Sequence, residues 1–226
     1  AAFFGAVRAG FVPVLLNTQT NADTLAYFLA DTEARLVLCE ATLLSEFSTE
    51  VLAGSDVETM VVGNGDAVND GQIAQRDFLD GQPTSLAPAD TTAADMAFWM
   101  YSSGTTGRPK GIVHLHHDMA YTHQSYGRQI LGITADDICF SVPKIFFAYG
   151  FGNSFTFPFS VGATTVLLPG RPDPARIFDC IERYRPTLFF GLPTLYTALC
   201  RADDASSRNL SSIRRSISAA ETLSGE

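Results

Sequence analysis

Short apolar runs alternate along this chain with segments whose apolar residues recur every three or four positions. Runs bounded by turn residues predict buried strands, and the wider spacing predicts amphipathic helices. We predict strands at 11–16, 35–39, 59–62, 96–101, 138–142, 164–168, 187–190 and 213–218. We predict helices at 1–9, 21–31, 41–52, 73–79, 116–131 and 174–184, and one that starts at 191–194. This alternation favours an α/β fold with mostly parallel sheets flanked by helices.

The stretch 63–94 departs from this rhythm. It is rich in Asp, Asn, Gly, Thr and Pro, and only 73–79 within it has a helical pattern, so it predicts a surface excursion. A chain of 226 residues can form one large domain or two smaller ones. We therefore expect two α/β subdomains, 1–95 and 96–226.

Residues 101–111 read YSSGTTGRPKG and follow a predicted strand directly. Small residues bury little surface, so this run predicts a loop whose backbone N–H groups and hydroxyls approach a ligand closely. Arg108 and Lys110 add positive charge, and together these features describe a cradle for a phosphate chain. A solvated Gly/Ser turn is the simpler alternative. A Walker A loop does not fit, because Pro109 and Gly111 stand where that motif requires Gly and Ser or Thr.

The longer run YSSGTTGRPKGIVH resembles the phosphate loop of the adenylate-forming enzymes, which include acyl- and aryl-CoA ligases, luciferases and peptide-synthetase adenylation domains. Residues 144–163 and 218–221 resemble the benzoate–CoA ligase branch of that family. The resemblance extends over all 226 residues. It implies part of the large N-terminal AMP-binding domain, and we expect the start of that domain and the small C-terminal domain to be missing from the sequence.

The resemblance implies three groups of site residues. The ATP phosphates would be held by Ser102, Ser103, Gly104, Thr105, Thr106, Gly107 and Lys110. Adenine would lie against Ala220, Glu221 and Thr222. The aryl group would be held by Phe147, Ala148, Tyr149, Gly150 and Phe151. Flat rings interleaved with small residues can wall a slot for a flat apolar ligand, although ordinary core packing explains most aromatic residues of 143–160.

The implied reaction is the ATP-dependent activation of a benzoate-like carboxylate to an acyl-adenylate, followed by transfer to CoA, with Mg²⁺ on the phosphates. Such a reaction serves the degradation of aromatic acids. The family's catalytic lysine, its ribose-binding Asp and a Tyr-Gly-x-Thr-Glu segment have no counterpart in this sequence. The catalytic residue is therefore unknown, and we expect residues 1–226 alone not to turn over.

Other functions fit parts of the pattern. A fatty-acyl-CoA ligase or an amino-acid adenylation domain would share the phosphate loop, although an amino-acid enzyme is expected to offer a carboxylate for the ammonium group and none lies between 145 and 162. A nucleotide-binding module without acyl chemistry and a non-enzymatic interaction domain that uses the aromatic run are alternatives from other classes.

The composition of the chain limits the kinds of binding partner that we expect. A net charge of −9 argues against nucleic acid or an anionic membrane as the main partner. Residues 145–170 carry no charge, but their Gly, Asn and Pro residues predict loops and short elements rather than a membrane span. Widely spaced cysteines predict free buried thiols in the cytoplasm. The histidines at 114, 116, 117 and 123 favour a polar helix start, and no metal site is expected.

Overall fold

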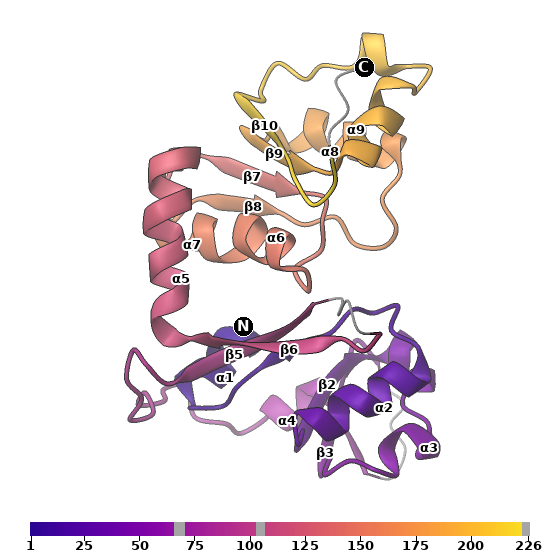
Figure 1. Ribbon diagram of the computed structural model, residues 1–226, viewed down its shortest axis with the longest axis vertical. Coiled ribbons are helices and arrows are strands. Elements are labelled where there is room, and N and C mark those ends of the chain that lie inside the picture. The colour runs from indigo at the N-terminus through magenta and orange to yellow at the C-terminus, as the bar shows by residue number, and fades with distance from the viewer. Residues whose placement is uncertain (66–70, 103–106, 223–226) are drawn as a thin grey trace. The chain divides into compact units, whose positions relative to one another are not determined.

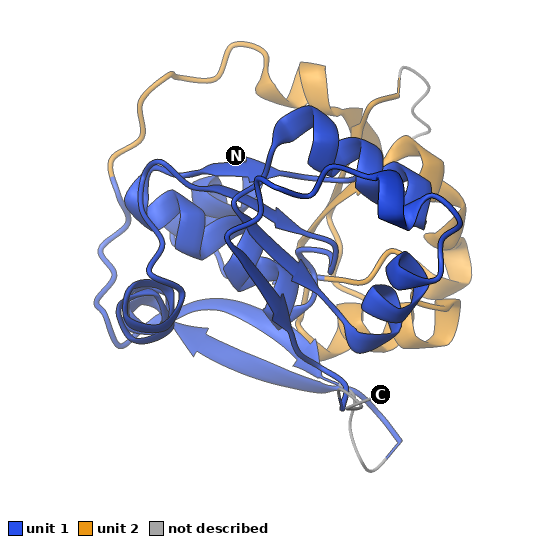
Figure 2. Ribbon diagram, turned by 90° about the horizontal axis from the view of Figure 1, so that it is seen from above, with its two compact units in different colours: residues 1–15, 88–226 blue, residues 16–87 orange. Residues whose placement is uncertain are grey.

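The computed structural model describes residues 1–65, 71–102 and 107–222, and it confirms the α/β architecture with mostly parallel sheets (Figure 1). The chain divides into two compact units, Ala1–Leu15 with Pro88–Glu226, and Leu16–Ala87 (Figure 2). This division differs from the predicted subdomains 1–95 and 96–226. The reason is that β1 (Val14–Leu15) pairs with β5 (Met96–Ser102), which keeps the N-terminal residues with the later part of the chain.

The smaller unit is built on a parallel three-stranded sheet. Its strands lie in the order β2 (Leu36–Glu40), β3 (Thr59–Gly63) and β4 (Gln72–Ala74). Helix α2 (Ala22–Asp31) is capped by Asn21, whose side chain accepts a hydrogen bond from the backbone N–H of Thr24. The buried core consists of Leu25, Leu29, Val37, Cys39, Val51, Met60 and Val62.

Two predictions in this unit are wrong in detail. The helix predicted at 41–52 is divided into a 3₁₀ helix, η1 (Ala41–Glu46), and α3 (Thr49–Leu52). The Ser48 hydroxyl accepts a hydrogen bond from the backbone N–H of Val51 and so starts a new helix. Strand β4 takes up Ile73, and α4 (Gln75–Leu79) therefore begins later than predicted.

The larger unit contains a three-stranded sheet that includes the predicted phosphate-loop strand. Its strand order is β1, β5 and β6 (Lys110–Leu115), with β6 antiparallel to β5. Strand β6 was not predicted, because the glycine-rich run obscured its apolar positions. Helix α1 (Ala2–Arg8) packs on this sheet through Phe3, which contacts the rings of Phe98 and Phe151 edge-on.

A second sheet in the larger unit has four parallel strands. Their order is β10 (Arg215–Ser218), β9 (Leu188–Gly191), β7 (Ile138–Ser141) and β8 (Thr164–Val166). Helix α8 (Pro174–Tyr184) packs Ile177, Phe178 and Ile181 against this sheet, and the Asp173 side chain caps its first turn. Helix α9 (Pro193–Cys200) follows β9 with Pro193 in its first turn, as predicted, and the short η4 (Ala205–Ser207) precedes β10.

Helical segments that contain π-helical turns connect these strands. The helix predicted at 116–131 is present as α5 (His116–Thr122) and the π-helical η2 (His123–Leu131). The aromatic segment folds as α6 (Ala148–Phe151), η3 (Gly152–Thr156) and α7 (Phe157–Val161), which lie beside β7 and β8 (Figure 1). None of the helices in the described ranges has the length and apolarity needed to cross a membrane.

Candidate functional site

The predicted phosphate loop joins β5 to β6. Ser102 ends β5, Lys110 begins β6, and these two residues are paired in the ladder. Gly107 and Lys110 are exposed, and Gly107 has a positive φ of 99°, which disfavours any other residue there. Ser103, Gly104, Thr105 and Thr106 lie outside the described residues. The antiparallel pair thus anchors both ends of the run.

Gly111 has a structural reason to be glycine. A Cβ at this position would lie 3.1 Å from the Trp99 ring, so the small residue leaves room for the indole against β6.

The carboxyl ends of the parallel strands provide a second part of the site. From β7 the chain passes to β8 on one side and then to β9 on the other, so the direction of winding reverses beside β7. Ligands of open α/β sheets bind outside the carboxyl ends of strands at such a reversal. The segment predicted for the aryl group follows β7, and the segment predicted for adenine follows β10.

Tyr149 is held at this edge by its hydroxyl. The Tyr149 hydroxyl donates to the backbone carbonyl of Ile217 at 3.0 Å, and the Tyr196 hydroxyl donates to the same oxygen at 2.9 Å. The Tyr149 ring stands edge-on to Phe190 with 6.4 Å between centroids. Burial raises the pKa of Tyr196 to about 12 and raises that of Tyr149 as well, so both remain neutral donors at physiological pH.

The five residues predicted for the aryl pocket lie in different surroundings. Tyr149 packs with the cluster around Phe190, whereas Phe151 is buried with Phe3 and Phe98 beneath the other sheet. Phe147 is half exposed, and Ala148 is exposed. The structure therefore does not bring all five together.

Gly150 is required by close backbone packing. A Cβ on this residue would lie 2.1 Å from the carbonyl oxygen of Lys144 and 2.4 Å from that of Pro143. These distances are far below van der Waals contact. Helix α6 can therefore pack this closely against the backbone of Pro143 and Lys144, which follows β7, only because residue 150 is a glycine.

The segment predicted for adenine continues from β10. Ala220 has a positive φ of 72°, which is unusual for a residue with a side chain, and it is exposed together with Glu221 and Thr222. The Glu221 carboxylate accepts hydrogen bonds from the backbone N–H of Thr194 at 3.1 Å and from its hydroxyl at 3.2 Å. This contact joins the end of the described chain to the start of α9.

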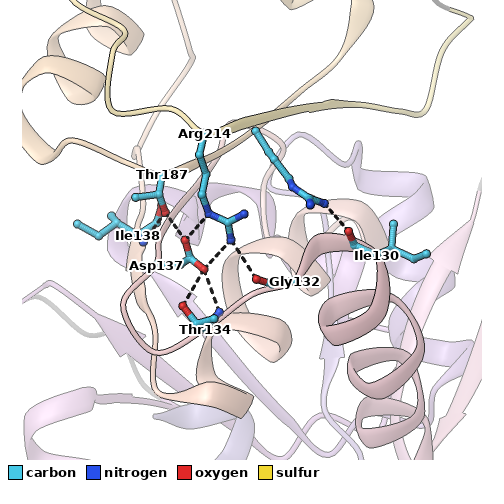
Figure 3. Close-up of polar contacts among 8 residues, drawn as sticks. Ile130, Gly132, Thr134, Asp137, Ile138, Thr187 and Arg214 are labelled. Carbon is cyan, nitrogen blue, oxygen red and sulfur yellow. Dashed lines mark hydrogen bonds and ion pairs between the residues drawn. The ribbon is translucent and has the colours of Figure 1, made fainter.

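At the other end of β10, the buried carboxylate of Asp137 forms an ion pair with the partly exposed Arg214 (Figure 3). Asp137, which is 4% exposed, accepts hydrogen bonds from the Arg214 guanidinium at 2.9 and 2.7 Å and from the Thr187 hydroxyl at 2.6 Å. The backbone N–H of Thr134 also donates to it at 2.9 Å. Burial by itself would raise the pKa of Asp137, but the hydrogen bonds and the charge of Arg214 hold it well below its usual range.

Sequence reasoning missed this network. The only local signal is an Asp in front of an apolar strand, and Asp136 and Asp137 satisfy it equally. Arg214 lies 77 positions away, so no local pattern connects it to either.

Two of the histidines share an acidic partner. The Nδ1 atom of His114 lies 3.3 Å from the Asp118 carboxylate, and the Nε2 atom of His117 lies 3.2 Å from the same carboxylate. The Nδ1 atom of His117 lies 2.8 Å from the carbonyl oxygen of Ala93. Within the described part of the chain, no three His, Cys, Asp or Glu side chains gather as a metal site would require. All four cysteines are free; Cys39 and Cys139 are buried as predicted, whereas Cys200 is exposed.

We predict that Tyr149→Phe and Tyr196→Phe each lower the free energy of unfolding by about 1 kcal/mol, because each removes the hydrogen bond to the Ile217 carbonyl while keeping the ring. The double variant is expected to lose more than the sum, since the Ile217 carbonyl then loses both hydroxyl donors. Urea unfolding of the three variants checks this. Tyr121→Phe, at an exposed ring, is the control and should leave stability unchanged; a strictly additive double variant would contradict the shared acceptor.

Comparison with known proteins identifies the family of this chain. The family model described as "AMP-binding enzyme" matches residues 1–226. A benzoate–CoA ligase of Thauera aromatica is 38% identical over 98% of this chain, and a 4-hydroxybenzoate–CoA/benzoate–CoA ligase of Rhodopseudomonas palustris is 40% identical over 98%. The chain spans 41% of the length of each of these relatives.

Solved structures of CoA ligases for aromatic acids are also similar to this chain. The anthranilate CoA ligase AuaEII in complex with anthranoyl-AMP aligns with a TM-score of 0.94 at 36% identity, over 98% of this chain and 43% of that one. A benzoate CoA ligase from Burkholderia xenovorans LB400 aligns with a TM-score of 0.86, also at 36% identity, over 98% of this chain and 43% of that one. With the family model matched from end to end, the chain belongs to the AMP-binding enzyme family.

Proposed function

We propose that the protein containing this chain activates an aromatic carboxylate with ATP and transfers the acyl group to CoA. The observation that carries this proposal is the likeness to an anthranilate CoA ligase that holds anthranoyl-AMP, because an aryl-adenylate is the intermediate that such a reaction requires. The identity to ligases of benzoate and hydroxybenzoate supports the same substrate class.

In the proposed reaction, a carboxylate oxygen attacks the α-phosphorus of ATP and pyrophosphate leaves. The thiolate of CoA then attacks the acyl carbon, and AMP leaves with the electrons of the broken C–O bond. The protein contributes mainly by positioning the reactants and stabilising charge on the phosphates. The residues between β5 and β6, with Lys110, are assigned to the β- and γ-phosphates.

The aryl ring is assigned to the edge of the sheet where Tyr149 lies. The Tyr149 hydroxyl already donates a hydrogen bond to the Ile217 carbonyl, so Tyr149 would offer the substrate its ring rather than a hydrogen bond. Mg²⁺ is proposed as the counter-ion of the triphosphate, with no ligand assigned to it among the described residues. A cytoplasmic location belongs to the same proposal, because ATP and CoA are cytoplasmic substrates. A role in the degradation of aromatic acids also belongs to it, because the proposed substrate is an aromatic acid.

ATP–pyrophosphate exchange with the full-length natural protein tests the proposal. The panel is benzoate, a long-chain fatty acid and phenylalanine. We expect exchange that depends on benzoate. Exchange with only the fatty acid or phenylalanine would contradict the aryl assignment and favour the other ligase classes. ATP binding without any carboxylate-dependent exchange would favour a nucleotide-binding module. Residues 1–226 alone are expected to give no acyl-adenylate.

A further inference from the structure

The Glu221 carboxylate caps a helix that is distant in sequence. The backbone N–H groups of the first helical turn have no partner within the helix, and a side chain at the N-cap usually accepts from one of them. Helix α9 has Leu192 at its N-cap, which offers no side-chain acceptor. Glu221 supplies the missing acceptor from 27 residues away, through the N–H and the hydroxyl of Thr194.

The residues before Glu221 are held at their other end as well. The Ile217 carbonyl accepts the hydroxyls of Tyr149 and Tyr196, and the chain then turns through Ala220 in the left-handed conformation. This conformation is costly for a residue with a Cβ and persists where surrounding contacts enforce it. The hydrogen bonds at Ile217 and at Glu221 lie on either side of Ala220 and can enforce its conformation.

We propose that Glu221 is a positioning residue, which holds residues 218–222 in place for the nucleotide by binding Thr194, and is not itself a contact of the adenine ring. Both carboxylate oxygens of Glu221 already accept hydrogen bonds from Thr194, and a negative charge is stabilised at the start of a helix. The inference rests on the proposed function in so far as the nucleotide is ATP.

Hydrogen exchange of the Thr194 amide tests the contact without any need for activity. In Glu221→Ala we expect this amide to exchange on the order of tenfold faster, because it loses the Glu221 acceptor and an amide of the first turn has no acceptor within its own helix. Glu221→Gln keeps an acceptor oxygen and should retain most of the protection. Thr197→Val removes a hydroxyl of the same helix that bonds Pro193 instead, and it should leave the Thr194 amide unchanged. Unchanged exchange in Glu221→Ala would overturn the proposal.

Nucleotide selectivity separates positioning from direct contact. The dissociation constants of ATP and of purine riboside triphosphate, which lacks the 6-amino group, are measured with the full-length protein. If Glu221 positions the segment, Glu221→Ala weakens both by a similar factor of about five, equivalent to one lost hydrogen bond. Thr194→Val should weaken both in the same direction, and the double variant should bind no worse than Glu221→Ala.

A direct hydrogen bond from the 6-amino group of adenine to Glu221 gives a different pattern. Glu221→Ala would then weaken ATP alone, Thr194→Val would have no effect, and the positioning role would be overturned. A wild-type protein that binds neither nucleotide would also overturn it. Normal ATP binding with no carboxylate-dependent pyrophosphate exchange would contradict the proposed function instead, and would leave the positioning result standing.

Discussion

Replacing Gly150 with alanine is expected to lower the free energy of unfolding by about 3 kcal/mol, at the upper end of the range for an overpacked core. The new Cβ would lie 2.1 Å from the Lys144 carbonyl oxygen and 2.4 Å from that of Pro143, and backbone atoms cannot move aside as a flexible side chain can. In a chain of this size the melting temperature should fall by about 6–12 °C. Differential scanning calorimetry measures the shift.

Gly5→Ala is the matched control, because Gly5 also lies in a short helix but has open space where a Cβ would be placed. Alanine is the better helix former, so this variant should be stabilised by about 0.5–1 kcal/mol. The opposite signs expected for two identical substitutions isolate the effect of the contact. If Gly150→Ala unfolds like the natural protein, α6 does not approach the segment after β7 as closely as the structure indicates.

Replacing Asp137 with asparagine is expected to cost about 3 kcal/mol of stability at neutral pH. Breaking a buried ion pair typically costs about 3–5 kcal/mol, and the lower end applies because Arg214 is 38% exposed and water can solvate its charge. The amide nitrogen of asparagine is a donor, and at least one of the donors from Arg214, Thr187 and Thr134 would lose its acceptor. Urea unfolding measures the change, and Asp136→Asn, at the neighbouring exposed carboxylate, is the control.

The pH dependence gives an independent check on Asp137. Its pKa is lower in the folded protein than the value of about 3.9 in an unfolded chain, so the ionised carboxylate stabilises the fold above that pH. This contribution is lost as the pH falls below about 4 toward the folded pKa. Asp137→Asn should therefore be less stable at pH 7 and should lose less additional stability between about pH 4 and pH 2. A parallel loss in both proteins would contradict the assignment.

Local patterns along the chain determined the class of fold and most of its elements. Asn21 and Asp173 cap helices within three residues of the atoms they bind, and the apolar runs that became β3, β7 and β9 need no distant information to be recognised as buried strands. The same holds for the run YSSGTTGRPKG, whose composition is sufficient to predict a loop for phosphate. The sequence also predicted a helix that starts at 191–194, and α9 begins there at Pro193, because proline suits a first turn.

Only the tertiary structure decided which distant residues meet. The Tyr149 hydroxyl and the Ile217 carbonyl are 68 positions apart, Asp137 and Arg214 are 77 apart, and Thr194 and Glu221 are 27 apart. Strand order brings these pairs together, and strand order depends on the packing of whole elements rather than on local spacing. Periodicity reports which face of an element is buried but not what covers it. The sequence indicated Tyr149, Gly150 and Glu221 as site residues. The fold shows that Tyr149 and Glu221 hydrogen-bond to distant backbone groups and that Gly150 packs closely against the carbonyl oxygen of Lys144.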